Sequence, residues 1–270
     1  MIHHRYFLFL LARRTPAFAA IIILLSSLSS VAQISPPGLD GARSVNWNAI
    51  GFTHHFSKKI NSSFYFGGEY QSDPTTAQIK KPGIFVLNQE TYWNFASRWQ
   101  LAFCASFRKE AVYQTAAPYD FENPGWANET RYYLRLFYRY KRGRWSFAHS
   151  FRPEYRGFYT TSWNQWPVVP IQLRFRLKLQ TTYDLKSHNN SLVVANEWLE
   201  ATNYNSSVMQ WGQLTFTEDR LSTYFRHAFK KPDMLFDAGV MHQVWFVNGV
   251  HYIPYLAFDI IFQNPFGRKS

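Results

Sequence analysis

The sequence predicts an all-β protein whose chain forms a single antiparallel transmembrane β-barrel. Three observations lead to this fold class: side chains alternate between apolar and polar along many segments, aromatic residues make up 19% of the chain, and the N-terminus has the pattern of a secretory signal. The mean hydropathy of −0.31 is compatible with a membrane location. A membrane barrel contains no long apolar run, because every second residue of each strand faces inward.

The alternation is strictest in residues 171–181. Every odd position from Ile171 to Leu179 carries a large apolar side chain, and every even position from Gln172 to Gln180 is polar or cationic. A period of two is that of a β-strand with unlike faces. Over about ten residues it is also the pattern of a barrel strand that turns apolar groups to lipid and polar groups to the lumen.

Further segments repeat this pattern, and the gaps between them alternate between short turns and longer stretches, as in outer-membrane barrels with short periplasmic turns and longer external loops. Eleven strands are counted in this way, but a barrel with both ends in the periplasm needs an even number. We therefore expect about twelve strands, or about ten if one pair is miscounted. Pro254 removes a ladder donor from the last strand, so a bulge is expected there. The other segments are 45–56, 60–70, 84–95, 98–112, 131–140, 145–156, 192–199, 220–229, 234–244 and 252–262.

The N-terminal segment has a different pattern from the rest of the chain. Three arginines precede an apolar run at 17–25, and a Ser-Val-Ala sequence ending at Ala32 has the small residues of a cleavage site. We expect residues 1–32 to be a secretory signal peptide, with an N-terminal membrane anchor as the alternative. Residues 33–44 are then a linker or a short first strand, and residues 45–266 form the barrel domain. The expected location is the outer membrane of a Gram-negative bacterium.

Five short segments, in this order, carry a resemblance to a known family. They are Asn-Glu-Thr-Arg-Tyr at 128–132, Phe-Arg-Pro-Glu-Tyr-Arg at 151–156, Leu-Arg-Phe-Arg-Leu at 173–177, Ala-Asn-Glu-Trp at 195–198 and Thr-Glu-Asp-Arg-Leu at 217–221. Together they resemble a family of Gram-negative outer-membrane proteins known as domain of unknown function 2490. The resemblance implies an outer-membrane β-barrel and brings no established activity.

The charged residues of the strands lie on the phase opposite to the apolar residues. If the apolar faces meet lipid, these charges line the lumen, where they must be paired and hydrogen-bonded. Arg108, Glu110, Glu129, Asp237 and Asp259 belong to this phase. The residues expected to line the lumen, as a channel wall or as an ionic plug, are Arg131, Arg135, Arg139, Arg152, Glu154, Arg156, Arg174, Arg176, Lys178, Glu197, Arg220 and Arg226.

Two functions are compatible with such a lumen. The first is a structural barrel filled by Arg–carboxylate pairs, because a small barrel has room for side chains but not for a wide pore. The second is a narrow channel that favours small anionic solutes, because Arg and Lys rings select for anions. The expected partners are outer-membrane lipid and, during insertion, the barrel-assembly machinery.

An outer-membrane lipid-modifying enzyme with an active site at the barrel rim is the alternative from another class. Its candidates are scattered: His149 and His227 fall on the lipid-facing phase, and no serine lies in a recognisable elbow. No cofactor and no metal site is expected, and the single cysteine allows no internal disulfide. A nucleic-acid partner is not expected despite the pI of about 9.7, because the basic residues are confined to one face of each strand.

Aromatic residues near the strand ends are expected to form girdles at the two membrane interfaces. The predicted interface residues are Trp47, Trp93, Trp99, Tyr140, Trp145 and Tyr252.

Overall fold

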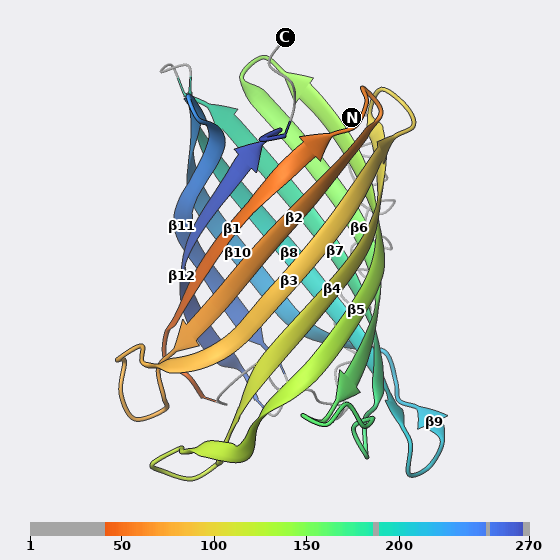
Figure 1. Ribbon diagram of the computed structural model, residues 1–270, viewed down its shortest axis with the longest axis vertical. Helices are drawn as coiled ribbons and strands as arrows, with labels where there is room; N and C mark the ends of the chain where they lie inside the picture. The colour runs from red at the N-terminus through yellow and green to blue at the C-terminus, as the bar shows by residue number, and fades with distance from the viewer. Residues whose placement is uncertain (1–40, 186–188, 247–248, 267–270) are drawn as a thin grey trace, which may run out of the picture. The chain divides into compact units, whose positions relative to one another are not determined.

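The computed structural model describes residues 41–185, 189–246 and 249–266, and every regular element in this part of the chain is a strand (Figure 1). The predicted signal peptide at 1–32 and most of the predicted linker at 33–44 lie outside the described residues. Within the described ranges, no helix is long and apolar enough to cross a membrane. The strands are β1 (Val45–His55), β2 (Ile60–Gln71), β3 (Lys81–Asn94), β4 (Trp99–Tyr113), β5 (Phe121–Arg142), β6 (Trp145–Tyr159), β7 (Ile171–Asp184), β8 (Asn190–Asn205), β9 (Gln210–Trp211), β10 (Thr215–Lys230), β11 (Asp233–Trp245) and β12 (His251–Gln263).

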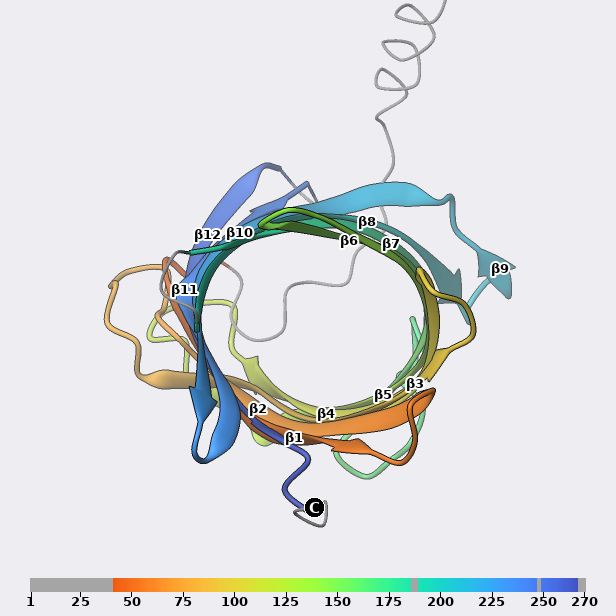
Figure 2. The ribbon, with the colours of Figure 1, turned by 90° about the horizontal axis from the view of Figure 1, so that it is seen from above.

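Eleven of these strands close into a barrel. Each strand from β1 to β8 pairs with the next one along the chain, β8 also pairs with β10, and β10, β11 and β12 continue the sheet. β12 then pairs with β1 and completes the ring, as the view along the barrel in Figure 2 shows. The two-residue strand β9 pairs only with β8 and projects outside the ring.

The strand number differs from the expected twelve or ten. When neighbouring strands run antiparallel around a ring, an odd number forces one pair to run parallel, and this pair is β1 and β12. Their ladder runs from Val45 opposite Tyr255 to Thr53 opposite Gln263. The expected even number assumed that the first strand begins, and the last strand ends, at the same end of the barrel. Instead, β1 begins and β12 ends at opposite ends of the barrel (Figure 1).

The connections differ at the two ends. The end that we call the short-turn end carries the connections β1–β2, β3–β4, β5–β6, β7–β8 and β10–β11. At the tightest of these, between Arg142 and Trp145, Gly143 adopts a φ of 59°, which a glycine reaches without steric cost. The opposite, long-loop end carries the remaining connections, including the hairpin with β9.

The barrel is apolar outside and charged inside. In β7, the side chains of Gln172, Arg174 and Arg176 are buried, whereas Leu177 and Leu179 are exposed. This pattern follows from the pleat, which turns successive residues to opposite faces. The inner face therefore holds the groups that could carry function.

The predicted interface aromatics lie on the outer face, with one exception. Trp99, Tyr140 and Trp145 are exposed near the short-turn end, and Tyr252 is exposed at the long-loop end. Trp47 does not belong to this group: its indole lies inside the barrel and donates to Asp259 Oδ1 at 3.1 Å. The two strands that it bridges are the parallel pair.

Pro254 is accommodated without the expected bulge. The register between β11 and β12 runs through the His242–Pro254 pair without a shift. The pairing of β12 with β1 begins only at Tyr255, so the missing N–H of Pro254 leaves no gap in the parallel ladder.

Candidate functional site

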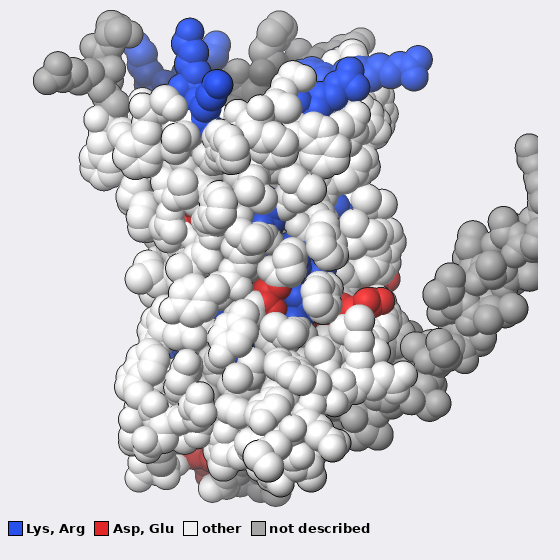
Figure 3. Space-filling view, turned by 90° about the vertical axis from the view of Figure 1, so that its right-hand side faces the viewer, with Lys and Arg blue, Asp and Glu red and all other residues white. Residues whose placement is uncertain are grey.

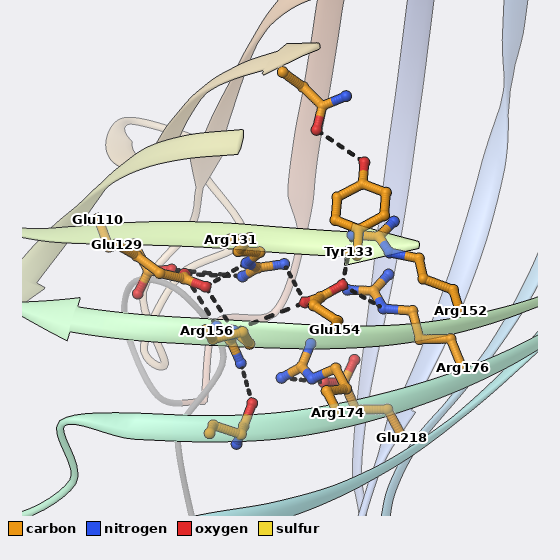
Figure 4. Close-up of polar contacts among 12 residues, drawn as sticks. Glu110, Glu129, Arg131, Tyr133, Arg152, Glu154, Arg156, Arg174, Arg176 and Glu218 are labelled. Carbon is orange, nitrogen blue, oxygen red and sulfur yellow. Dashed lines mark hydrogen bonds and ion pairs between the residues drawn. The ribbon is translucent and has the colours of Figure 1, made fainter. Parts of the chain in front are cut away.

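The candidate site is an ionic network on the inner face of β5–β8 and β10 (Figure 4). The strand pleat brings its members together. In β5 and β6, Arg131 lies directly opposite Arg156, and Tyr133 lies opposite Glu154. Like charges that face each other across strands are destabilising unless carboxylates lie between them. Glutamates supply those carboxylates.

Glu154 is the centre of the network. Its carboxylate lies 2.5 Å from Arg152 Nη2, 3.3 Å from Arg131 Nη1, 3.4 Å from Arg176 Nε and 3.9 Å from Arg156 Nε. The Glu154 side chain is 0% exposed. A buried carboxylate is stable only when cations and hydrogen bonds replace its hydration. Four guanidinium groups supply the cations here, as ion pairs, while neither Glu154 oxygen meets the geometry of a hydrogen bond.

Glu129 forms the second node, nearer the long-loop end. Arg156 forms a bidentate pair with it, because Nε donates to Oε1 at 2.6 Å and Nη2 donates to Oε2 at 3.0 Å. Arg131 also donates to both oxygens of Glu129, with Nη2 at 2.9 Å from Oε2. The remaining Arg156 nitrogen, Nη1, donates to Gln172 Oε1 at 2.5 Å, and Gln172 Nε2 donates to Asn203 Oδ1 at 2.8 Å. This layer thereby joins β5, β6, β7 and β8.

Glu218 and Glu197 extend the network to β10 and β11. Arg174 Nη2 lies 3.4 Å from Glu218 Oε1, and Gln243 Nε2 donates to Glu218 Oε2 at 2.9 Å. Arg220 also donates to Glu218 through Nε, at 2.9 Å. Arg176 lies 3.5 Å from Glu197 Oε2, so this one arginine contacts both Glu154 and Glu197. The carboxylates are therefore connected through shared arginines.

Tyr133 links the network to β3. The guanidinium carbon of Arg152 lies 3.3 Å from the centre of the Tyr133 ring, which is a cation–π contact. The Tyr133 hydroxyl donates to Glu90 Oε1 at 2.6 Å. Arg135 Nη2 lies 3.4 Å from the same oxygen. Polar contacts therefore run around the barrel wall from β3 to β11.

The side chains become more exposed toward the short-turn end. Arg226 forms a bidentate pair with Asp237 near that end, at 2.7 and 2.6 Å, and these side chains are 32% and 18% exposed. Closer to the long-loop end, Glu129 and Arg156 are only 1% and 2% exposed. On the opposite wall Gln243 is equally buried. In the long-loop half, buried polar side chains therefore lie on both of these opposite walls.

The predicted lumen residues fall into three groups. Arg131, Arg152, Glu154, Arg156, Arg174, Arg176, Glu197 and Arg220 belong to the network, and Arg135 joins it through Glu90. Arg226 forms its separate pair with Asp237. Within the described ranges, Arg139 and Lys178 have no carboxylate oxygen within 4 Å; the Arg139 guanidinium instead lies 4.5 Å from the centre of the Phe137 ring.

Sequence reasoning missed two of the carboxylates. Glu218 lies two residues before Arg220 and shares its face, so a strict period of two would have found it. Glu90 was harder to recognise, because the same face of β3 begins with the apolar residues Ile84 and Val86.

Comparison with known families agrees with the resemblance noted above. The sequence model described as "Protein of unknown function (DUF2490)" matches residues 45–251, from the start of β1 to the first residue of β12. The chain belongs to the DUF2490 family. The matched region contains every residue of the ionic network. Comparison with the curated proteins gives no match.

Proposed function

We propose that this DUF2490 protein is an integral β-barrel of the outer membrane of a Gram-negative bacterium, and that its lumen is plugged by the Arg–Glu network. The barrel then acts as a closed structural scaffold. The observation that carries the proposal is Glu154, whose fully buried carboxylate is held by four arginines in the middle of the lumen.

The distribution of side chains supports a membrane environment. Large apolar residues point away from the barrel around its middle: Phe66, Leu87, Phe103, Leu134 and Leu177 are between 44% and 54% exposed. In water such a continuous apolar surface would be a site of aggregation. In a bilayer the same surface meets hydrocarbon, while the charges stay inside the barrel.

The barrel ends support the same reading. In Figure 3, lysine and arginine side chains gather at the short-turn end, beyond a broad surface with little charge. Lys58, Lys59 and Arg98 lie in the turns there, and Lys141 and Arg142 end β5 at the same end of the barrel. Next to these turns lie the exposed aromatics Trp99, Tyr140 and Trp145. An aromatic belt followed by cations is the order expected where a barrel leaves the hydrocarbon and enters the headgroup region.

The plugged lumen is supported by the exposure gradient. A pore needs a continuous water path, whereas Glu129, Glu154 and Arg156 are excluded from water on one wall. On the other wall, near the parallel strands, Gln71 and Tyr255 are buried as well. Burial on both walls supports a long-loop half that is filled by side chains.

The test is single-channel conductance of the refolded protein in planar bilayers. We expect the native protein to be electrically silent, although its band on an unheated gel shows a folded, heat-modifiable barrel. The double variant Glu129→Ala with Arg156→Ala removes the most enclosed pair and is expected to give conductance steps. A matched control, Arg226→Ala with Asp237→Ala, removes a pair from the more exposed half and should remain silent. Steady steps from the native protein would refute the plug.

A narrow, anion-favouring channel is the second candidate. It is favoured by the cationic residues of the short-turn half. Within the described ranges, Arg139 and Lys178 have no carboxylate oxygen within 4 Å, although Lys178 lies opposite Glu197 in the ladder, and Arg226 is partly exposed. A salt gradient in the same experiment separates the candidates. Anion selectivity that disappears when Arg174 and Arg176 are neutralised would support the channel.

The rim enzyme has no comparable support. His54 packs against the rings of Phe56 and Phe266, and His227 Nδ1 lies 2.5 Å from Asn190 Oδ1. Neither contact is the serine–histidine pair that acyl transfer requires. An assay for lipid products on the refolded protein tests this alternative directly.

A further inference from the structure

The ladder between β5 and β6 lacks two pairs near its middle, although its register is unchanged across them. Their ladder pairs Tyr133 with Glu154 and then resumes at Leu136 opposite Phe151, so the two intervening pairs are missing. Pro153 lies in this gap. Proline has no N–H to donate across the ladder, and within a sheet it is normally confined to edges and bulges.

This interruption differs from the other irregularities of the sheet. The other irregularities are register shifts close to the strand ends at the long-loop end. They occur at Glu69/Tyr70, Ala111/Tyr113 and Phe216/Glu218. The gap at Pro153 lies in the middle of β6, at the height of the Glu154 node. At that height Figure 3 shows acidic and basic atoms within an otherwise uncharged outer surface.

A groove of about 430 Å³ opens on the outer face at this gap. Its walls are outward-facing apolar side chains, among them Phe103, Leu134 and Phe175. Its floor includes Pro153 together with Glu154, which belongs to the lumen-facing phase of β6. The groove therefore lies next to the Glu154 node of the ionic network.

We propose that this groove binds one acyl chain of a membrane phospholipid. The inference rests on the membrane location proposed above. The groove is continuous with the apolar outer surface, so its surroundings in a bilayer are lipid tails. Backbone groups and charges next to hydrocarbon are costly unless covered. A chain lying over the gap covers the two positions without ladder pairs and separates Glu154 from the surrounding lipid.

The shape of the site favours a flexible chain over a protein segment. β5 is also paired with β4, and β6 is also paired with β7 through Pro153 opposite Phe175. The gap therefore offers no free strand edge to which another chain could add. Walls of aromatic and branched side chains, by contrast, suit an unbranched hydrocarbon.

The test uses phosphatidylethanolamine vesicles that contain a phospholipid with a photoactivatable acyl chain. After refolding and illumination, the positions of the adducts on the protein are mapped by mass spectrometry. We expect the adducts to concentrate on the lining of the groove, around Leu134, Pro153 and Phe175. Pro153→Val restores the ladder donor and should reduce these adducts several-fold.

Leu134→Trp fills the groove without touching the ladder and should have the same effect, which covers the case in which Pro153→Val fails to fold. Leu221→Trp, at an exposed outward position of β10, is the matched control and should leave the groove adducts unchanged. Adducts distributed evenly around the barrel, or crosslinks between two copies of the chain at the groove, would overturn the acyl-chain site and leave the membrane location intact. A protein that fails to enter the vesicles, and so carries no adducts on its outer face, would refute the membrane location itself.

Discussion

The most direct test of the network is Glu154→Gln. Glutamine keeps the size of the side chain but removes the charge, and its amide N–H groups point at guanidinium donors. Arg131, Arg152, Arg156 and Arg176 then share a buried region without their common counter-ion. Removing one partner of a buried ion pair costs about 3–5 kcal/mol, because the remaining charge is left uncompensated. We expect a loss of about this size in the free energy of unfolding.

The assay is urea-induced unfolding of the refolded protein in lipid vesicles, followed by tryptophan fluorescence. Lys141→Gln is the matched control, because its pair with Asp184 at 2.9 Å has side chains that are 61% and 40% exposed. Exposed pairs contribute about 0–1 kcal/mol. Arg152→Gln provides a second comparison: Glu154 keeps its other arginines in that variant, so the loss should be nearer about 1.5–3 kcal/mol. If Glu154→Gln cost no more than Lys141→Gln, the carboxylate would not be the centre of the network.

Two further predictions concern the parallel closure of the ring. Asn48→Cys together with Phe258→Cys, in a cysteine-free background, should form a disulfide on oxidation, because these residues are Cα partners across β1 and β12. Moving the second cysteine to Ile260 should abolish it, and efficient crosslinking at the shifted position would contradict the register. Gly67→Ala should destabilise the barrel by about 1–3 kcal/mol, since a Cβ there would lie 2.4 Å from Trp47 Cζ2 and force the indole out of its place. An unchanged urea midpoint would show that the indole is not fixed by this contact.

Much of the fold could be predicted from the sequence, because a period of two encodes both the strands and the two faces of the wall. The side chains of β7 alone, from Gln172 to Leu179, separate buried polar residues from exposed apolar ones. The period is a local property, and each strand carries it independently. It therefore predicts strand positions without long-range information.

The closure of the ring could not be predicted in the same way. The pattern counted eleven strands, and the parity argument raised that count to twelve. Whether β1 pairs with β12 in parallel depends on contacts between residues more than two hundred positions apart, such as Trp47 with Asp259. Trp47 also shows why a tryptophan near a strand end is ambiguous. Only the phase of its strand decides whether it faces lipid or the lumen.

The pairing of each arginine with a particular carboxylate could not be predicted from the sequence either. Alternation places Arg131, Arg152 and Arg176 on the inner face, but it does not say which carboxylate each one meets. Glu154 becomes the common partner because β5, β6 and β7 are neighbours and their registers bring all three arginines to its height. The single sequence feature that marks this point is Pro153, which interrupts the ladder beside it.

The positions of the parallel pair and of the network are related. In the ring order, β6 and β7 lie on the far side from β12 and β1. The inner faces of β1 and β12 carry small residues, among them Ala49, Gly51 and Ala257. A parallel ladder is slightly weaker per residue than an antiparallel one, and Trp47 adds a side-chain bond across it. The Trp47–Asp259 hydrogen bond therefore reinforces the one pairing of the ring whose backbone ladder is the weaker kind.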